Sequence, residues 1–289
     1  MKRLLLEKHE VYAILRETSD LCKLPAEVRE DIHFHACRYD SYDSIQEIFS
    51  SISRKEKRLL LFHLAAYVLS GGHDKNDVSY LIESNLAFGT MLVDAAVHAG
   101  IRCLVNTGTY WQYYESSSYH PVNLYAATKQ AYQDILRYFE EVEGVHVINL
   151  ILYDIYGPAI GGVERKKILD YLREHADELK MIDMSLGEQQ MNYVYVEDVV
   201  RAYLRAGDIL IDGQYNLCGS YAVRADQEFT LRTIVEAYLG FLSAKLRIRW
   251  GGIPYRKREV MQPTHHLPIL PGWKAEVTLE DGLKRCAIS

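Results

Sequence analysis

Short apolar runs that alternate with helical patterns constrain the fold of this chain more than any other feature. The runs cover residues 10–15, 58–64, 104–107 and 145–152. Between them, apolar residues recur at helical spacing, most clearly over residues 78–99 and 128–144. Strands that alternate with helices of this length predict βαβ units and a parallel sheet. We expect an α/β fold whose doubly wound parallel sheet binds ligands beyond the carboxyl ends of its strands.

Tyr125 and Lys129 have the spacing that best suits catalysis. Four residues apart on a helix, they share one face and lie one turn from each other. There the ammonium of Lys129 can favour the phenolate of Tyr125 and lower its pKa from about 10. Such a tyrosine can exchange a proton with a sugar hydroxyl, and Thr109 could hydrogen-bond the same oxygen. The alternative is an exposed Tyr–Lys pair in a chain that has 22 tyrosines.

Composition argues against several classes of partner. The 289 residues carry a formal net charge of -6, which gives no reason to expect nucleic acid or an anionic membrane. The five cysteines are scattered and odd in number, which favours reduced thiols in the cytoplasm over a disulfide framework. No apolar run reaches membrane-spanning length. The histidine pairs at 33/35 and 265/266 lack a third ligand, so we expect no metal.

The pattern changes near residue 157. We expect residues 1–156 to form the parallel-sheet domain, and residues 157–289 to form mainly a small α/β substrate lobe with some segments returning to the sheet. Within this second part, the sequence predicts a loop at residues 161–162, a charged helix over 165–178 and a strand over 214–218. Residues 251–273 are rich in Arg, Pro and Gly, which is typical of an irregular binding loop.

Several motifs, taken together, carry a family resemblance. They are His63-Leu64-Ala65-Ala66, residues 85–90, Asn106-Thr107-Gly108-Thr109, residues 125–129, Tyr156-Gly157-Pro158 and residues 193–198. In this order and spacing the chain resembles the extended short-chain dehydrogenase/reductases, specifically the nucleotide-sugar epimerase, dehydratase and ketoreductase group. Within that group it is most similar to 4-ketoreductases of the CDP-abequose and CDP-paratose synthase type. The resemblance implies a modified Rossmann fold that binds a dinucleotide in the first domain and a nucleotide sugar in the second.

The resemblance also implies roles for individual residues. Tyr125 would be the acid/base, Lys129 its pKa partner and a ribose ligand, and Thr109 a hydrogen-bond donor to the sugar C4 oxygen. The residues implied to bind the cofactor are Arg16, Asp40, Leu64, Ala65, Ala66, Asn85, Thr107, Tyr125, Lys129 and Tyr153. Those implied to bind the substrate are Thr109, Asp154, Arg256 and Arg258, with Arg258 on the pyrophosphate.

Arg16 bears on the choice of cofactor. It follows the first predicted strand, where an acidic residue would bind the ribose hydroxyls of NAD, whereas arginine suits the extra phosphate of NADP. We therefore expect NADP rather than NAD, with Asp40 on the adenine. The alternatives are a solvated Arg16 and an Asp40 that starts a loop. Thr107 and Thr109 could likewise satisfy only local backbone groups.

The chain departs from the family pattern in two places. Met191-Asn192 stands where relatives usually carry Arg-Asp, which removes one expected phosphate contact. The family also opens with a strand and a Gly-x-x-Gly-x-x-Gly loop that lets the backbone approach a pyrophosphate, and neither is found here. That strand normally lies in mid-sheet, so its neighbours would lack ladder partners. We expect this chain by itself to be unstable and to bind NADP poorly. The alternatives to an enzyme are a non-catalytic nucleotide-binding relative and a fragment that is inactive because the Gly-rich loop is absent.

The expected reaction is hydride transfer at sugar C4, by a NAD(P)-dependent epimerase or 4-ketoreductase, and the residues do not separate these two. A 4,6-dehydratase is disfavoured, because such relatives place Asp-Glu directly after the active Thr and here Tyr110-Trp111 follow Thr109. The resemblance also implies a homodimer through the helices at 78–99 and 127–141. The alternative is that these helices only cover the sheet.

Overall fold

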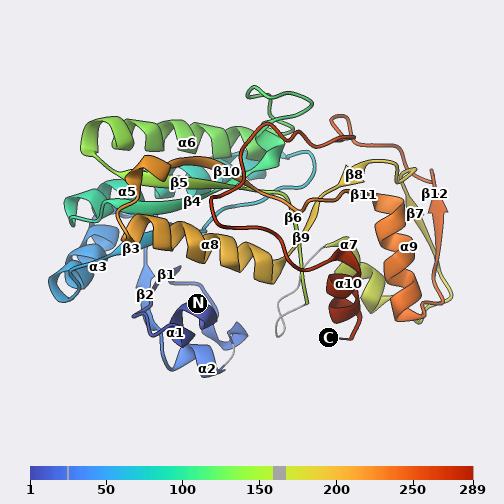
Figure 1. Ribbon diagram of the computed structural model, residues 1–289, viewed down its shortest axis with the longest axis horizontal. Coiled ribbons are helices and arrows are strands. Elements are labelled where there is room, and N and C mark those ends of the chain that lie inside the picture. The colour runs from blue at the N-terminus through green and yellow to red at the C-terminus, as the bar shows by residue number, and fades with distance from the viewer. Residues whose placement is uncertain (25, 159–166, 289) are drawn as a thin grey trace.

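Strands and helices alternate along most of this chain, as expected. The computed structural model describes residues 1–24, 26–158 and 167–288 (Figure 1). The glycine loop predicted at 161–162 and the start of the helix predicted over 165–178 lie outside the described residues. Over the described residues, every helix is too short or too polar to span a bilayer.

The main sheet consists of parallel strands in the order β10-β5-β4-β3. Their bounds are Leu60–His63 for β3, Cys103–Thr109 for β4, His146–Leu152 for β5 and Gly219–Val223 for β10. The register pairs Leu152 of β5 with both Thr109 and Val223. The carboxyl ends of β4, β5 and β10 therefore meet at one edge, and the residues that follow these strands gather there.

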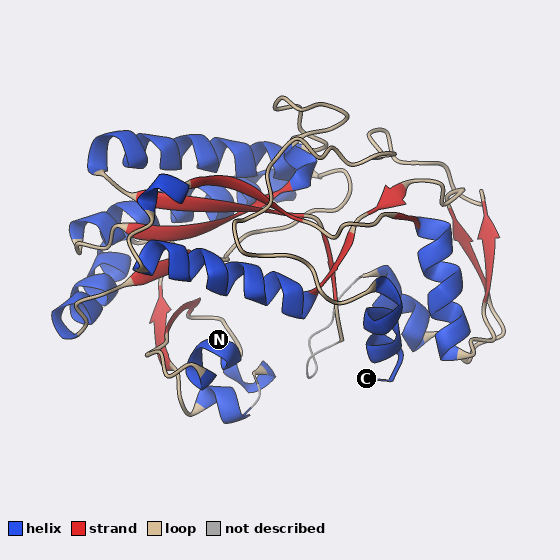
Figure 2. Ribbon diagram, viewed as in Figure 1, coloured by secondary structure: helices blue, strands red, loops and turns tan. Residues whose placement is uncertain are grey.

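Helices cover both faces of this sheet, which confirms the doubly wound α/β fold (Figures 1 and 2). Because side chains alternate along a strand, Leu104 of β4 packs on one face with α5 (Phe88–His98) and α6 (Leu124–Glu143). Its neighbour Val105 packs on the other face with α8 (Val196–Ile211).

Two further parallel strands lie outside the main sheet. Strand β1 (Tyr12–Arg16) pairs with β2 (His33–Cys37), and in Figure 1 this pair runs up the page, across the direction of the main sheet. Ile14 of β1 and Leu61 of β3 share one apolar cluster with α3 (Tyr42–Lys55). Among the described residues β3 pairs only with β4, and β1 pairs only with β2. The family pattern places a central strand between β1 and β3, so the edges that this strand would join have no strand partner here. The short helices α1 (Lys2–Leu6) and α2 (Ala26–Arg29) pack on the β1–β2 pair.

A second apolar core lies in the C-terminal part of the chain, at the right of Figure 1. Its helices are α7 (Ile168–Glu174), α9 (Leu231–Leu242) and α10 (Leu279–Ile288), and its parallel strands are β7 (Met181–Met184) and β12 (Arg247–Trp250). Two small strand pairs lie between the cores: β6 (Asp154–Tyr156) with β9 (Tyr193–Tyr195), and β8 (Gln190–Met191) with β11 (Phe229–Thr230). Helix α8 and strand β10 pack with the main sheet instead.

Two elements differ from the sequence-based expectation. The helix predicted over 78–99 is interrupted, because α4 (Lys75–Ile82) leads through a π-helical turn, Glu83–Ala87, into α5. Asn85 lies in this π-helical turn, and its side chain makes hydrogen bonds with Tyr67 and Thr128, which lie outside this helix. The strand predicted over 214–218 is wrong. Residues Tyr215–Leu217 form a 3-10 turn, and pairing with β5 begins only at Gly219.

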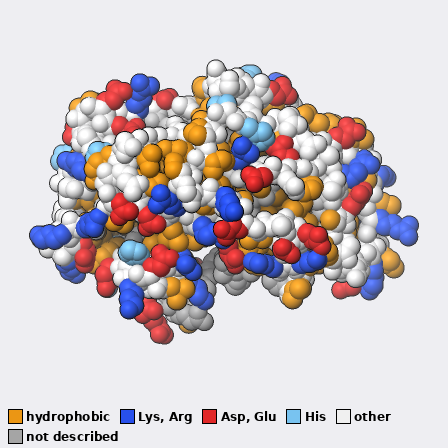
Figure 3. All heavy atoms as spheres, in the orientation of Figure 1, with side chains coloured by type: hydrophobic (Ala, Val, Ile, Leu, Met, Phe, Trp, Pro, Cys, Tyr) orange, Lys and Arg blue, Asp and Glu red, His pale blue; other side chains and the backbone are white. Residues whose placement is uncertain are grey.

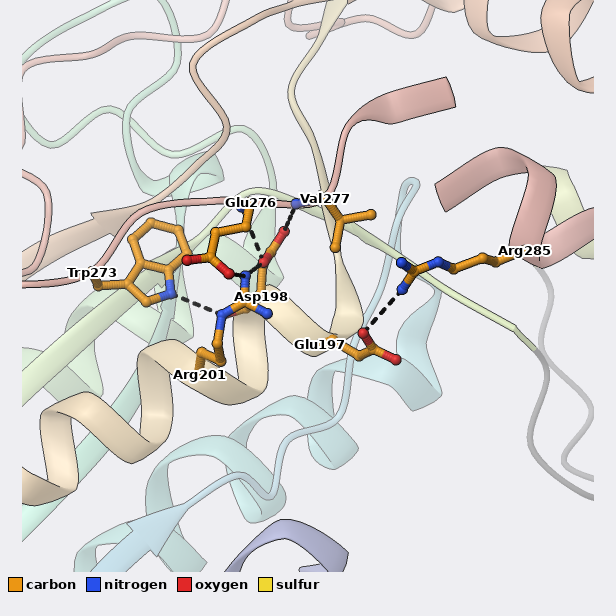
Figure 4. Close-up of polar contacts among 7 residues, drawn as sticks. All are labelled: Glu197, Asp198, Arg201, Trp273, Glu276, Val277 and Arg285. Carbon is orange, nitrogen blue, oxygen red and sulfur yellow. Dashed lines mark hydrogen bonds and ion pairs between the residues drawn. The ribbon is translucent and has the colours of Figure 1, made fainter. Parts of the chain in front are cut away.

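A buried carboxylate holds the C-terminal segment on the start of α8 (Figure 4). Asp198 is 0% exposed and accepts hydrogen bonds from the backbone N–H groups of Glu276, at 3.2 Å, and Val277, at 3.1 Å. Arg201 contacts both Asp198 and the Glu276 carboxylate, and the Trp273 indole donates to the Asp198 carbonyl at 2.9 Å. On the face drawn in Figure 3, acidic and basic side chains are interleaved across the middle of the molecule.

Asp198→Ala is expected to lower the free energy of unfolding by about 3 kcal/mol, because each N–H group left without an acceptor costs about 1–3 kcal/mol. The control is Glu197→Ala, which removes the adjacent but exposed ion pair with Arg285 and should cost less than about 1 kcal/mol. Urea unfolding of both variants measures the difference. Equal losses would show that the contacts of Asp198 do not hold the segment.

Candidate active site

Helix α6 places Tyr125 and Lys129 one turn apart, as the sequence predicts. The helix begins after Asn123, whose side chain accepts from the N–H of Ala126 at 3.0 Å and donates to the carbonyl of Leu69 at 3.0 Å. Asn123 therefore caps the helix and ties its start to the loop that follows β3. Tyr125 and Lys129 are 8% and 3% exposed, so the alternative of an exposed Tyr–Lys pair is wrong.

Burial, rather than the neighbouring lysine, controls the ionisation of Tyr125. Burial raises the pKa of the Tyr125 phenol to about 12 and lowers the pKa of the Lys129 ammonium to about 8. The expected lowering of the phenol pKa by Lys129 is therefore not found, because the loss of hydration dominates. The phenol is protonated near neutral pH and is able to donate a proton.

The end of β4 brings two threonines and another tyrosine together. Thr107 Oγ1 donates to the carbonyl of His63 at 2.9 Å and lies 2.5 Å from the hydroxyl of Tyr203 on α8. Thr109 is 8% exposed, and its Oγ1 accepts from the N–H of Trp111 at 3.4 Å. Thr109 satisfies a local backbone group, as the alternative had it, whereas both partners of Thr107 are distant in the sequence. The contacts of both threonines with ligands stay predictions.

Asn85 supports the loop that was expected to line a cofactor. Its Oδ1 accepts from the N–H of Tyr67 at 2.7 Å, and its Nδ2 donates to the Tyr67 carbonyl and to Thr128 Oγ1, both at 3.0 Å. Asn85 is 2% exposed, so it joins this loop to α6 inside the protein. The residues that follow β3 are Leu64 and Ala65, which are exposed, and Ala66, which is half-buried.

Two tyrosines and a carboxyl group lie together at the carboxyl ends of β4 and β5. Tyr110 and Tyr153 stack with ring centroids 4.8 Å apart and planes at 9°. The Tyr110 hydroxyl lies 3.2 Å from each carboxyl oxygen of Asp154. Burial raises the pKa of Asp154 to about 7, although the Tyr110 hydrogen bond opposes this rise. A carboxyl group that ionises near neutral pH is thus held next to Tyr153.

Arg256 and Arg258 reach loops of the first part of the chain. Arg256 donates to the carbonyl of Ser70, and Arg258 donates to the carbonyl of Pro121 and to His120 Nε2. In Figure 1 the segment that carries these arginines crosses over the top of the molecule beside the green loop that precedes α6. Both guanidinium groups are therefore engaged with the protein itself, and their phosphate contacts stay predictions.

Arg16 and Asp40 lie away from this group. Arg16 ends β1 and is exposed, and Asp40 forms an exposed ion pair with Arg38 at 3.6 Å. Among the described residues, no contact joins either side chain to Tyr125, because the β1–β2 pair is separate from the main sheet. Their expected roles at the adenine end of a cofactor stay predictions.

His63 and Tyr203 join the site without a local sequence signal. His63, at the end of β3, is 2% exposed, and neither ring nitrogen has a hydrogen-bond partner among the described residues. Burial and the charge of Lys129 lower its pKa to about 3, so the ring is neutral. His63 is therefore a buried, neutral core histidine. Tyr203 contacts Thr107 across a separation of 96 residues, which no short motif reports.

The residues at this edge fit the nicotinamide end of a dinucleotide. Lys129 is buried, and no hydrogen-bond partner for its ammonium is found within the described ranges, so a ribose hydroxyl would satisfy it. The exposed Ala65 adds a small side chain beside the strand ends. In the same ranges, no group of three or more His, Cys, Asp or Glu side chains could hold a metal ion.

The raised pKa of Asp154 makes folding stability depend on pH. The pKa is raised to about 7 in the folded chain, from about 3.9 in an unfolded one, so the contribution is present at low pH and is lost as pH rises through 7. Asp154→Asn keeps the shape and removes the charge. Its melting temperature should therefore rise relative to the native chain between pH 4 and about 7.

The matched control is Asp177→Asn, which changes a carboxylate that is 97% exposed and should show no such trend. Melting curves followed by circular dichroism over this pH range provide the measurement. A constant difference between the Asp154 variant and the native chain would contradict the assigned ionisation.

Comparisons with known proteins agree with this architecture. Residues 1–218 match the NAD dependent epimerase/dehydratase family. The CDP-abequose synthase of Salmonella muenchen is 26% identical over 219 residues, which are 74% of this chain and 72% of that protein. The UDP-glucose 4-epimerase of Thermotoga maritima, solved with UDP-glucose, has a TM-score of 0.81 at 19% identity, covering 99% of this chain and 92% of that one.

A second solved structure, the UDP-glucose 4-epimerase of Thermus thermophilus in complex with NAD, has a TM-score of 0.79 at 20% identity and covers 99% of this chain and 93% of that one. At these identities the solved structures show a shared fold. The match over residues 1–218 covers most of this chain and therefore shows the family as well as the fold. The chain belongs to the NAD dependent epimerase/dehydratase family, a group of nucleotide-sugar epimerases and reductases.

Proposed function

We propose that this protein transfers a hydride at C4 of a nucleotide sugar, as a NAD(P)-dependent epimerase or 4-ketoreductase. The observation that carries the proposal is the buried pair Tyr125 and Lys129 on one face of α6, at the end where α6 is tied to the loop after β3. The CDP-abequose synthase relatives support the substrate class, as does the fold shared with a UDP-glucose-bound epimerase.

Tyr125 acts as acid and base at the C4 oxygen. In reduction, C4 of a keto sugar gains a hydride, and the oxygen takes the phenolic proton of Tyr125. In oxidation, the phenolate takes the hydroxyl proton as the hydride leaves C4. Thr109 donates a hydrogen bond to the same oxygen, and Lys129, with a pKa of about 8, is positively charged at neutral pH and stabilises the phenolate. A bound nicotinamide supplies or accepts the hydride.

The remaining assignments follow from placement. Leu64 and Ala66 line the cofactor, and Tyr153 lies against the nicotinamide. Arg16, exposed and without an ion-pair partner among the described residues, binds the additional phosphate of NADP in preference to NAD. A homodimer is supported by exposed apolar side chains on α4 and α6, namely Val78, Tyr80, Tyr138 and Val142.

A non-catalytic nucleotide-binding protein is the second candidate. The edges of β1 and β3 that have no strand partner favour it. They separate Arg16, which ends β1, from the main sheet that positions the proposed catalytic residues. Two observations favour the enzyme: Thr109 and Tyr125 are both buried in register with the family pattern, and Lys129 is buried on the same helix face as Tyr125.

Tyr125→Phe is expected to reduce turnover by about 100-fold or more while cofactor affinity stays unchanged, because only the transferable proton is removed. Tyr215→Phe is the matched control, since it makes the same change at an exposed tyrosine outside both the candidate site and the proposed dimer face, and should leave turnover unaffected. Turnover and cofactor binding are measured separately, the latter by calorimetry. Undiminished turnover in the Tyr125 variant would refute its assignment.

Incubation with UDP-, CDP- and dTDP-sugars separates the reaction types. Net consumption of NADPH with a 4-keto sugar identifies a reductase, and interconversion of isomers without net oxidation identifies an epimerase. Formation of a 4-keto-6-deoxy product would contradict the argument from Tyr110 and Trp111. Tight nucleotide binding without any turnover would support the non-catalytic candidate.

A further inference from the structure

Arg224 is a cation at the candidate site that the sequence motifs do not explain. It directly follows β10, whose last residue Val223 pairs with Leu152 of β5, so it emerges at the same sheet edge as Tyr153. The Tyr153 N–H donates to the Val223 carbonyl at 3.4 Å. Arg224 is thus the chain neighbour of a residue that Tyr153 contacts, and its positive charge opposes the rise that burial produces in the Tyr153 pKa.

The guanidinium of Arg224 lacks the acceptors that a half-buried arginine needs. Its Nε is buried and has no hydrogen-bond partner among the described residues, and its Nη1 makes one long contact, 3.5 Å, with the carbonyl of Ala225. Within the same part of the chain, no carboxylate forms an ion pair with it, and the nearby Glu228 pairs with His265 instead. A buried donor without an acceptor costs free energy, so this side chain is suited to an anionic group that arrives with a ligand.

Asn192 fixes the backbone around Arg224. Its Nδ2 donates to the Ala225 carbonyl at 3.0 Å, and its Oδ1 accepts from the Ala225 N–H at 2.7 Å. Asn192 is 0% exposed, so the pair is an internal anchor. Met191-Asn192 is also the place where the resemblance led us to expect Arg-Asp. Asn192 thus ties the residue directly after Arg224 to the segment where the expected arginine is missing.

We propose that Arg224 binds the diphosphate of the nucleotide sugar and replaces in space the arginine missing at position 191. The proposal rests on the proposed function, since it assumes a nucleotide-sugar substrate. It is favoured over an assignment to Arg256 and Arg258 alone, because both of those guanidinium groups already donate to backbone carbonyls of other loops. A phosphate would give Arg224 paired, charge-assisted hydrogen bonds.

The test compares nucleoside diphosphates with nucleosides by calorimetry, using UDP, CDP, uridine and cytidine. Arg224→Gln is expected to weaken diphosphate binding by about 10- to 100-fold and to leave nucleoside binding and NAD binding unchanged. Arg224→Lys should recover part of the loss, because it keeps the charge without the planar donor pair. Arg247→Gln is the matched control, since it removes an exposed arginine on β12 at the far end of the C-terminal part.

Each outcome bears on a different claim. If the native protein binds neither UDP nor CDP, the proposed function falls, and this inference falls with it. If the native protein binds them and Arg224→Gln binds them equally well, the inference alone is overturned. An equal loss of nucleoside affinity, or a loss of NAD affinity, would also overturn it, because the diphosphate would then not be the group that Arg224 contacts.

Discussion

The parallel register between β4 and β5 is the constraint on which the candidate site depends. Pairing of Thr109 with Leu152 brings two residue runs to one edge: Thr109 and Tyr110 from one strand, Tyr153 and Asp154 from the other. A slip of one residue would exchange the two faces of β4 and turn Val105 away from α8. The stacking of Tyr110 on Tyr153 and the contact of Tyr110 with Asp154 follow from this alignment.

Burial controls the protonation states of the side chains at this edge of the sheet. The same loss of hydration keeps Tyr125 protonated, keeps His63 neutral, and brings the pKa values of Lys129 and Asp154 toward neutrality. In such an environment a proton donor and a cation interact more strongly than they would in water. In the proposed reaction, Lys129 therefore does not need to lower the phenol pKa beforehand, since the ammonium would act on the phenolate once the proton has moved.

The parts of the site that short motifs encode could be predicted from sequence. The α6 pair needs only helical spacing, and the parallel sheet needs only alternating apolar runs and helices. The contact between Tyr203 and Thr107 joins residues 96 apart, and the Tyr110–Asp154 contact joins residues 44 apart. Only the packed fold reveals such pairs. The π-helical turn around Asn85 and the strand at 219–223 escaped prediction for the same reason, since tertiary hydrogen bonds and sheet pairing decide them.

The path of the hydrogen at sugar C4 tests the central claim most directly. Nucleotide sugars labelled with deuterium at C4 are incubated with the protein and nicotinamide cofactor, and mass spectrometry follows the label in sugar, cofactor and water. Direct hydride transfer predicts that the label stays on C4 of the product or appears on the nicotinamide. Release of the label into water would contradict it, because the hydrogen would then have left C4 as a proton.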